Sequence, residues 1–368
     1  MTMTRSTLPA ALVLAALLLP MPGAAQETKT TFREQIQVTE VLLDVLVTDK
    51  SGNVIVGLNQ DDFIVEENGN PVEITGVAFY SNRLNLDEQA RPSEVPADRY
   101  LIFFFHDQRR LDGLAQQVVL REQLDAARRT KEWIEKEMLG GDWVAVVRYD
   151  TSLLIHQDFT QDRQALIQAV EDAMRGKRPK NVWPSRRPEQ AELAARRPSL
   201  LAHLPEGKAL RNQTKKIYDG LRVLAEATAD IQGRKSVLLF TAGFGELQLV
   251  SGATKGDPRF YPRMQQALNA HNVAVYPIDL KRSEVEGLQA SFMNQLAQDT
   301  GGEFYDNVVN YLTPLRQIAD ENNGYYLLSY RAQHPAGEAG YQVVTVRTRN
   351  REFQVRARQG YRYGTPQG

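Results

Sequence analysis

The chain has 368 residues, of which 42% are hydrophobic and 24% charged, and its formal net charge at pH 7 is −1. This length predicts about two or three domains, and the composition is ordinary for a soluble globular protein. A charge near zero gives no general attraction to nucleic acid or to anionic membranes. The sequence has no cysteine, which excludes disulfides, thiolate metal sites and a cysteine nucleophile.

Residues 1–25 have the pattern of a cleavable signal peptide. Arg5 supplies a weak positive n-region, residues 10–20 are apolar, and the small residues 23–25 offer a cleavage site before Gln26. The apolar run is shorter than the ~20 residues that a helix needs to cross a bilayer. We therefore expect a periplasmic or secreted protein with no integral membrane segment after signal removal. An uncleaved N-terminal anchor is the alternative.

The N-terminal segment, residues 26–80, predicts β structure. Apolar residues alternate between Val41 and Val47, and residues 53–58 are expected to return as a second strand. Strands at 63–67 and 72–77 flank Asn68 and Gly69, a pair that favours a hairpin because it accepts positive φ. Residues 81–98 are polar, contain two prolines and are expected to form a linker.

Residues 99–323 alternate between apolar strands and amphipathic helices, which predicts a doubly wound, mostly parallel α/β sheet. The first strand, 101–105, is a continuous apolar run that stops at His106 and Asp107. Such a run is typical of a strand buried on both faces. The other strands are expected at 143–148, 153–155, 236–241, 273–278 and 303–305, and the helices at 112–139, 162–174, 217–231, 258–271, 286–300 and 311–322. The buried face of the first helix is expected to contain Leu120, Leu124, Ala127, Ile134 and Met138.

Residues 175–211 interrupt this alternation with many basic residues and repeated prolines. They could form an anion-binding patch, or a solvated insertion with a short helix near 189–196 and Trp183 as its anchor. Residues 324–368 return to a period of two, with strands expected at 325–330, 341–347 and 352–358. Because neither end of the chain alone buries enough apolar surface, we expect the two ends to pair into one small all-β domain beside the α/β core.

Several segments together carry a resemblance to a known family. They are VLLDVLVTDKSGNVIVGLNQDDFIVEENGNPVEI near the N-terminus, YLIFFFHD, GRKSVLLFTAGF, QLAQDTGGEFYDN, YYLLSY and VRARQGY. Their order and spacing resemble the von Willebrand factor A (VWFA) domain, and more narrowly the exported bacterial "VWFA-related" proteins best known from acidobacteria. The resemblance covers nearly the whole chain after residue 25. It implies an A-domain α/β core flanked by β structure, used for adhesion or protein assembly rather than catalysis.

The resemblance also implies a site for Mg²⁺ or Mn²⁺. In A domains this ion is held by a D-x-S-x-S loop, a threonine on a second loop and an aspartate after the fourth strand. Asp107 matches the first ligand, but Arg109 and Leu111 occupy the serine positions. Thr241-Ala242-Gly243 replaces the T-D-G signature, so its aspartate is missing, and Thr214 lies near the place of the loop threonine. A hard cation needs several oxygen ligands, and Arg109 adds positive charge, so we expect a degenerate site with no bound metal.

We therefore expect a non-enzymatic protein without a cofactor, which binds an unknown protein partner and no nucleic acid. The expected binding face contains Asp107, Arg109, Thr214, Thr241 and Gly243. One alternative is a metal-dependent adhesion domain with a remodelled site that uses Asp107, Asp150 or Asp279. A less favoured alternative is a hydrolase that uses these carboxylates.

Three local patterns have structural explanations as well as functional ones. His106 and Asp107 are adjacent on a strand and are expected to point to opposite faces, which argues against an acid–base dyad. Asp107 could simply form an ion pair with a nearby arginine. The glycine-rich segment 241–245 could offer backbone N–H groups to an anion, or could form a tight turn.

Overall fold

The computed structural model describes residues 36–81, 98–107, 114–179, 181, 183, 197–247, 254–280, 290–322, 324–335 and 338–364. The predicted signal peptide, most of the predicted linker, Arg109, Leu111 and the helix predicted at 189–196 lie outside these residues. The strands and helices described below belong to one compact unit, Ile36–Gly368.

The core contains a five-stranded sheet with the order β11-β8-β5-β6-β7. β5 (Arg99–His106) is its central strand and pairs in parallel with β6 (Asp142–Tyr149) and β8 (Lys235–Thr241). β11 (Val273–Asp279) continues the sheet in parallel beyond β8. The predicted mostly parallel α/β sheet is thus confirmed.

The far edge of this sheet is antiparallel. β7 (Leu153–Thr160) is longer than the predicted 153–155 and pairs antiparallel with β6. The connection between the two strands is too short for a crossover, so it can only join antiparallel neighbours. At the other edge, Ile278 forms a parallel bridge with Tyr305.

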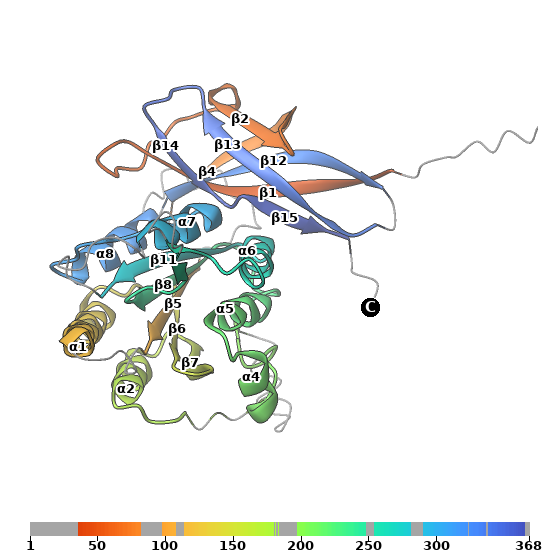
Figure 1. Cartoon of the computed structure of the whole chain (residues 1–368). Coiled ribbons are helices and arrows are strands. Elements are labelled where there is room, and N and C mark those ends of the chain that lie inside the picture. The colour runs from red at the N-terminus through yellow and green to blue at the C-terminus, as the bar shows by residue number, and fades with distance from the viewer. Residues whose placement is uncertain are drawn as a thin grey trace, which may run out of the picture. The chain divides into compact units, whose positions relative to one another are not determined.

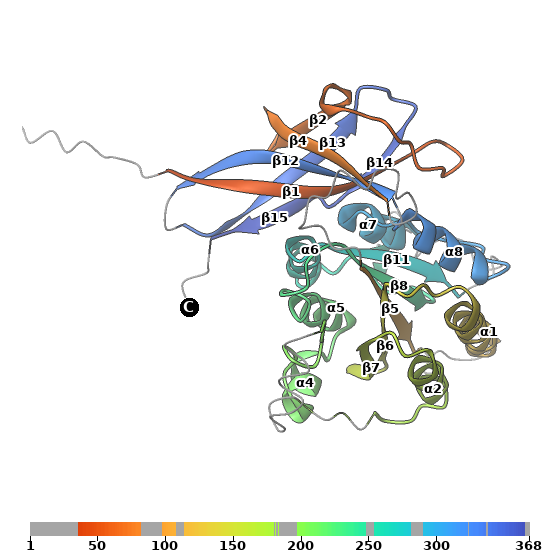
Figure 2. The same cartoon turned by 180° about the vertical axis from the view of Figure 1, so that it is seen from behind.

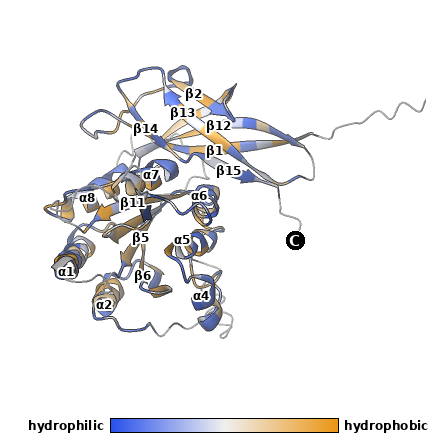
Figure 3. Ribbon diagram, in the orientation of Figure 1, coloured by the Kyte–Doolittle hydropathy of each residue, from blue (hydrophilic) through white to orange (hydrophobic). Residues whose placement is uncertain are grey.

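Helices cover both faces of the sheet (Figures 1 and 2). Ile102 and Phe104 pack on one face, and Leu101, Phe103 and Phe105 pack on the other, because successive side chains of a strand alternate. The first face is covered by α5 (Ile217–Glu226), α6 (Tyr261–Ala270) and α7 (Ala290–Thr300), and the second by α1 (Leu114–Lys136), α2 (Arg163–Met174) and α8 (Leu312–Glu321). Figure 3 shows hydrophobic residues concentrated on the strands and hydrophilic ones along outer helices such as α4 (Gly207–Gln213).

The predicted buried face of α1 is partly wrong. Ala127, Ile134 and Met138 are buried, but Leu120 and Leu124 are 40% and 51% exposed. The polar residues Glu122 and Gln123 are buried in their place. The hydroxyl of Tyr311 donates to Glu122 across 3.3 Å, so a tertiary hydrogen bond helps to compensate the burial of a carboxylate that the hydrophobic pattern assigns to solvent.

The two ends of the chain share two antiparallel sheets. The first has the order β14-β1-β12-β4, formed by β1 (Ile36–Thr48), β4 (Ile74–Ser81), β12 (Gly324–Pro335) and β14 (Gln354–Ala357). The second has the order β15-β13-β2-β3, formed by β2 (Phe63–Glu67), β3 (Asn70–Val72), β13 (Gly340–Thr348) and β15 (Gly360–Tyr363). Alternate residues of β1, including Leu43 and Val45, share a core with Tyr326 and Leu328 of β12.

Several predicted strands differ from the observed ones. Residues 53–58 make a single bridge, between Val54 and Thr48, and do not form a strand. The hairpin turn is present, with φ of 49° at Asn68 and 81° at Gly69, but the predicted strand 72–77 is divided between β3 and β4, which lie in different sheets. The predicted strand 352–358 is β14 alone, and β15 begins at Gly360. The pattern also missed α4, the 3₁₀ helix η1 (Gln60–Asp62) and the two-residue strands β9 (Glu246–Leu247) and β10 (Thr254–Lys255).

Trp183, the predicted anchor of the basic insertion, is 6% exposed and packs in the core on the α5 face of the sheet. In the described part of the chain, no helix combines the length and the apolar character needed to cross a membrane.

Candidate functional site

The site predicted from the sequence lies at the carboxyl ends of β5 and β8. These neighbouring strands are where the connections of the sheet change direction, since the chain leaves β5 toward β6 on one side while β8 lies on the other. Open α/β sheets bind ligands at such a switch point. His106 and Asp107 end one strand, and Thr241 and Gly243 lie at the end of the other.

The carboxylate of Asp107 is held by a buried arginine. Nε of Arg148, the penultimate residue of β6, donates to Oδ2 of Asp107 over 3.1 Å, and a terminal guanidinium nitrogen donates to the same oxygen. The two side chains are only 3% and 6% exposed. The backbone N–H of Asp107 donates to the carbonyl of Tyr149 over 2.7 Å, which fixes the aspartate beside β6. A positive charge from within the fold thus lies against the residue that matches the first metal ligand.

Asp150 also lies near this guanidinium, with its Oδ2 3.6 Å from Arg148. Its other oxygen accepts from the backbone N–H and the hydroxyl of Thr151. Burial alone would raise the pKa of Asp150, but these hydrogen bonds and the charge of Arg148 together lower it. Asp150 is therefore an anion that adds to the charge balance around Arg148.

The side chain of His106 contacts β8, whereas that of Asp107 contacts Arg148 of β6. Its Nδ1 lies 2.9 Å from Oγ1 of Thr241, and the same hydroxyl oxygen accepts the N–H of Gly243 over 2.9 Å. The rings of Tyr149 and Phe244 lie edge-on to the imidazole, at centroid distances of 5.8 and 6.0 Å. Burial lowers the pKa of His106 to about 4, against the opposing charge of Asp107. The imidazole is therefore neutral at pH 7. Its hydrogen bond to Thr241 links the carboxyl ends of β5 and β8.

Thr214 has a different environment from the other predicted residues. Its side chain is fully buried, donates to the carbonyl of Leu210 over 2.7 Å and accepts the N–H of Leu153 over 3.0 Å. The hydroxyl thus joins the end of α4 to the start of β7. The structure brings Asp107, Thr241 and Gly243 to one switch point, uses Thr214 for a structural bridge, and does not describe Arg109.

The described residues offer no cluster of ligands for the alternative of a remodelled metal site. Nowhere among them do three or more His, Asp or Glu side chains gather closely enough to hold a metal ion. Asp107 and Asp150 are bridged by Arg148, and the backbone N–H of Asp279 donates to the carbonyl of Tyr305 at the opposite side of the sheet.

Two residues of this region were missed from the sequence. Arg148 follows an apolar run, WVAVV, and an arginine at the end of a buried strand beside an aspartate-terminated strand is the signal that could have identified it. His156 is the extra residue of a bulge in β7, because Ile155 pairs with Val147 and Gln157 with Val146. Burial, followed by the charge of Arg148, lowers the pKa of His156 to about 4.

Comparison with known proteins assigns no family. No family model and no curated protein matches the chain. Among solved structures, proximal thread matrix protein 1 from the mussel byssus has 16% identity and a TM-score of 0.38, covering 61% of this chain and 48% of that one. BatB from Bacteroides thetaiotaomicron has 12% identity and a TM-score of 0.35, covering 61% and 98%. The ArnB paralog VWA2 from Sulfolobus acidocaldarius has 9% identity and a TM-score of 0.32, covering 89% and 75%.

The chain thus spans about half the length of the mussel protein. Scores and identities this low carry no argument about function, so the assignment of class rests on the strand order and pairing given above. These define an α/β protein with a mostly parallel central sheet beside two antiparallel sheets.

Proposed function

We propose that the protein is an exported, non-enzymatic binding protein of VWFA type, which recognises another protein through the carboxyl-end face of its core sheet without a metal ion. The observation that carries this proposal is the buried pair between Asp107 and Arg148. Together with the VWFA-like sequence segments, it supports an A-domain face whose metal position has been replaced by an internal cation.

The electrostatics of the pair oppose a divalent cation at Asp107. A cation placed there would face the guanidinium of Arg148 at short range, in a setting where both side chains are almost fully buried. Moving Arg148 aside would leave a buried charge without its carboxylate, which typically costs several kcal/mol. The residues present therefore do not fit a metal-dependent adhesion site.

The hydrolase alternative has one geometrical argument, the hydrogen bond between His106 and the hydroxyl of Thr241. A nucleophile must reach its substrate, but Thr241 is 1% exposed and its oxygen already accepts the N–H of Gly243. Asp107 does not orient this histidine as the third member of a triad would, since its carboxylate is bound to Arg148. These contacts favour a rigid binding face over a catalytic site.

The experiment is site-specific photo-crosslinking. The chain starting at Gln26 is made with a photoreactive amino acid at Thr151, which is exposed beyond the carboxyl end of β6, and separately at Arg351, which is exposed in the turn before β14. Each variant is incubated with an envelope extract of the source organism, in Mg²⁺ or in EDTA. We expect a protein adduct from position 151 under both conditions and none from 351. Adducts that disappear in EDTA, or that form equally at 351, would contradict the proposal.

Export is tested separately by intact mass. The natural chain, recovered from the cells that produce it, is expected to begin at Gln26. A mass that retains residues 1–25 would support the uncleaved anchor instead.

A further inference from the structure

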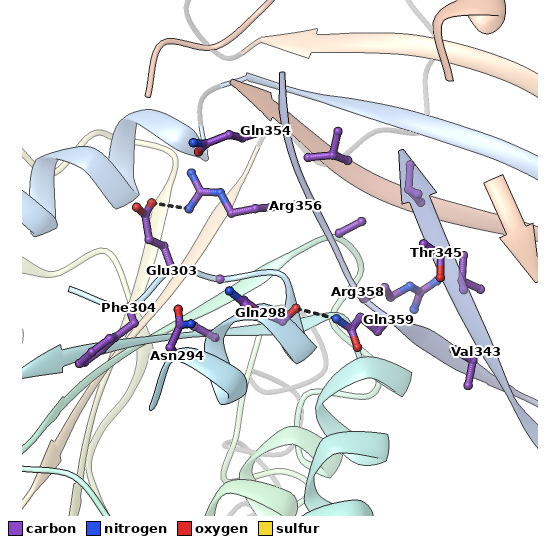
Figure 4. Close-up of a pocket in the computed structure, with 16 residues that line it drawn as sticks. Asn294, Gln298, Glu303, Phe304, Val343, Thr345, Gln354, Arg356, Arg358 and Gln359 are labelled. Atoms are coloured by element: carbon purple, nitrogen blue, oxygen red, sulfur yellow. Dashed lines mark hydrogen bonds and ion pairs between the residues drawn. The ribbon is translucent and has the colours of Figure 1, made fainter. Parts of the chain in front are cut away.

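A recess with a volume of about 720 Å³ lies between α7 and the strands β13 and β14 (Figure 4). This volume is within the range of about 300 to 1,000 Å³ that is usual for ligand pockets. Its lining includes the C-terminal half of α7, the residues that follow this helix and the facing parts of the two strands. The recess is distant from the switch point. Arg356, which lines it, donates to Glu321, and the next residue, Asn322, accepts a hydrogen bond from Ser236 near the amino end of β8.

β14 exposes one unpaired edge to this recess. It is the terminal strand of its sheet and pairs only with β1, where Leu46 faces Arg356 and Thr48 faces Gln354. The carbonyl of Val47 accepts the N–H of Ile55 over 2.9 Å, so the backbone of Val47 points away from β14.

The backbone N–H and C=O groups of successive residues in a strand point to opposite sides. Those of Leu46 and Thr48 therefore point toward β14, and those of their partners Arg356 and Gln354 point toward β1. The N–H and C=O of Val355 and Ala357 therefore point to the open edge.

Val355 and Ala357 differ in whether other residues pack against their open side. Gly301, with φ of 78°, packs directly on Ala357, and a Cβ at this glycine would lie 2.8 Å from the carbonyl carbon of Ala357. The close approach closes that end of the edge. For Val355, no residue in the described part of the chain forms a hydrogen bond on this side. One strand position is thus left with a donor and an acceptor facing the recess.

The polar, uncharged side chains of the recess are four amides and one hydroxyl, beside valines, alanines and Phe304. They are Asn294, Gln298, Thr345, Gln354 and Gln359. Each amide offers both donors and an acceptor, as a peptide group does. Asn294 and Gln298 are one helical turn apart on the exposed face of α7, opposite the exposed Thr345 of β13. Sites for small molecules are lined mainly by apolar and aromatic side chains, whereas this recess combines apolar side chains with several amides beside an open strand edge, which favours a peptide backbone.

Most charged groups of the recess have partners within the protein, although Nε of Arg358 has no hydrogen-bond partner among the described residues. Arg356 donates to Glu303 over 2.7 Å and to Glu321 over 2.6 Å, as Figure 4 shows for Glu303. The guanidinium of Arg358 donates to the carbonyls of Asn269 and Leu42, over 3.2 and 2.6 Å. A charged ligand would have to break these contacts, so the recess favours an uncharged one.

We propose that this recess binds an extended, uncharged peptide segment of a partner protein, which adds to the open edge of β14 as a further strand. Main-chain hydrogen bonds to Val355 give affinity, and the amide and hydroxyl side chains select polar, uncharged residues. The site goes beyond the proposed function, shares no residue with the Asp107 face, and can bind whether or not that face does.

The test uses a phage-displayed library of random heptapeptides, selected against the chain that starts at Gln26. Val355→Pro removes the N–H at the open edge, and Val355→Ala is its matched control because it shortens the side chain but keeps the N–H. Thr345→Trp fills the recess from β13, and Arg347→Trp is its control, since Arg347 is exposed on the same strand but does not line the recess. Thermal unfolding of each variant verifies folding.

We expect enriched peptides that are uncharged and bind at least tenfold more weakly to Val355→Pro and to Thr345→Trp, and within about threefold of wild type to the two controls. If Val355→Pro does not fold, the Thr345 pair decides the result. The proposal is overturned if no peptide is enriched, if the enriched peptides bind all variants equally, or if the recess instead binds neutral glycans on an array in a manner insensitive to Val355→Pro.

Discussion

Asp107 and Arg148 lie at the carboxyl ends of the neighbouring parallel strands β5 and β6, and their side chains form a buried ion pair with Nε of Arg148 3.1 Å from Oδ2 of Asp107. The residue that resembles the first metal ligand of an A domain is thus neutralised from the adjacent strand. Removing one partner of a buried ion pair costs much more unfolding free energy than replacing both partners by apolar side chains. The first prediction follows from this difference.

Replacing Arg148 alone by Met is expected to lower the free energy of unfolding by about 3 to 5 kcal/mol, because it leaves the buried carboxylate of Asp107 without its counter-ion. The double change Asp107→Leu with Arg148→Met removes both charges and is expected to cost much less than the two single changes added together. Urea unfolding of the wild type, both single variants and the double variant measures the coupling. Additive losses would show that the two side chains do not stabilise each other.

A second prediction concerns acid and His106. Burial holds its pKa at about 4 in the native state, below the ordinary value of 6.5. Between these values the unfolded chain binds a proton that the native chain does not, so stability is complete above pH 6.5 and is lost as the pH falls. One such group lowers the free energy of unfolding by about 2 kcal/mol between pH 6.5 and 5.

The matched variant is His106→Asn, which can keep a hydrogen bond to Thr241 but does not titrate. Its unfolding free energy, measured at intervals from pH 7 to pH 5, is expected to fall less than that of the wild type. His156 contributes in the same direction, because its pKa is also about 4, so the double variant with His156→Asn is expected to be flatter still. An unchanged slope in both variants would refute the assignment.

The third prediction concerns Lys235, which is 2% exposed and whose Nζ donates to the carbonyl of Ile231 over 2.8 Å. Burial lowers its pKa to about 7, the charge of Asp44 opposes this shift, and Arg358 adds to it. Above pH 7 the unfolded chain therefore keeps a proton that the native chain has lost, and stability rises with pH by about 1 kcal/mol per unit. Lys235→Met is expected to abolish this rise between pH 7 and 9, whereas Lys208→Met, at an exposed position, should retain it.

The fourth prediction concerns Asp158, which fixes the chain where it returns from the basic insertion. Its carboxylate accepts the hydroxyl of Ser199 over 2.6 Å, and the N–H groups of Leu200 and Phe159 over 2.7 and 2.9 Å. Asp158→Ala leaves these donors without their acceptor and is expected to cost about 1 to 3 kcal/mol. Chymotryptic cleavage after Leu200 should accelerate in this variant and remain unchanged in Asp61→Ala, an exposed control. Equal cleavage rates in the two variants would contradict the assigned role.

The central sheet could be predicted because its strands are buried on both faces. A run such as residues 101–105 is apolar at every position, and helices α2 and α8 begin and end within about a residue of their predicted limits. The arrival of Asp107 beside the end of β8 also follows from the strand order alone. These features depend on local pattern and on rules of connection that hold for α/β sheets in general.

The remaining features depend on tertiary contacts. Leu120 and Leu124 fit the helical period but are exposed, because Glu122 is buried with Tyr311 instead. The division of 72–77 between two sheets reflects two different partners, because β3 pairs with the nearby β2 whereas β4 pairs with β12, where Val77 faces Leu328. Period-two alternation does not distinguish those sheets. The sequence predicted an ion pair between Asp107 and a nearby arginine but could not identify Arg148, which the parallel register of β5 and β6 brings to it.

The proposed binding face at Asp107 must function without a divalent ion. Isothermal titration of Mn²⁺ into the chain that starts at Gln26, compared with its Asp107→Ala variant, tests this. We predict no binding tighter than about 1 mM to either protein. Submillimolar binding to the wild type that is lost in Asp107→Ala would contradict the claim that Arg148 has replaced the metal.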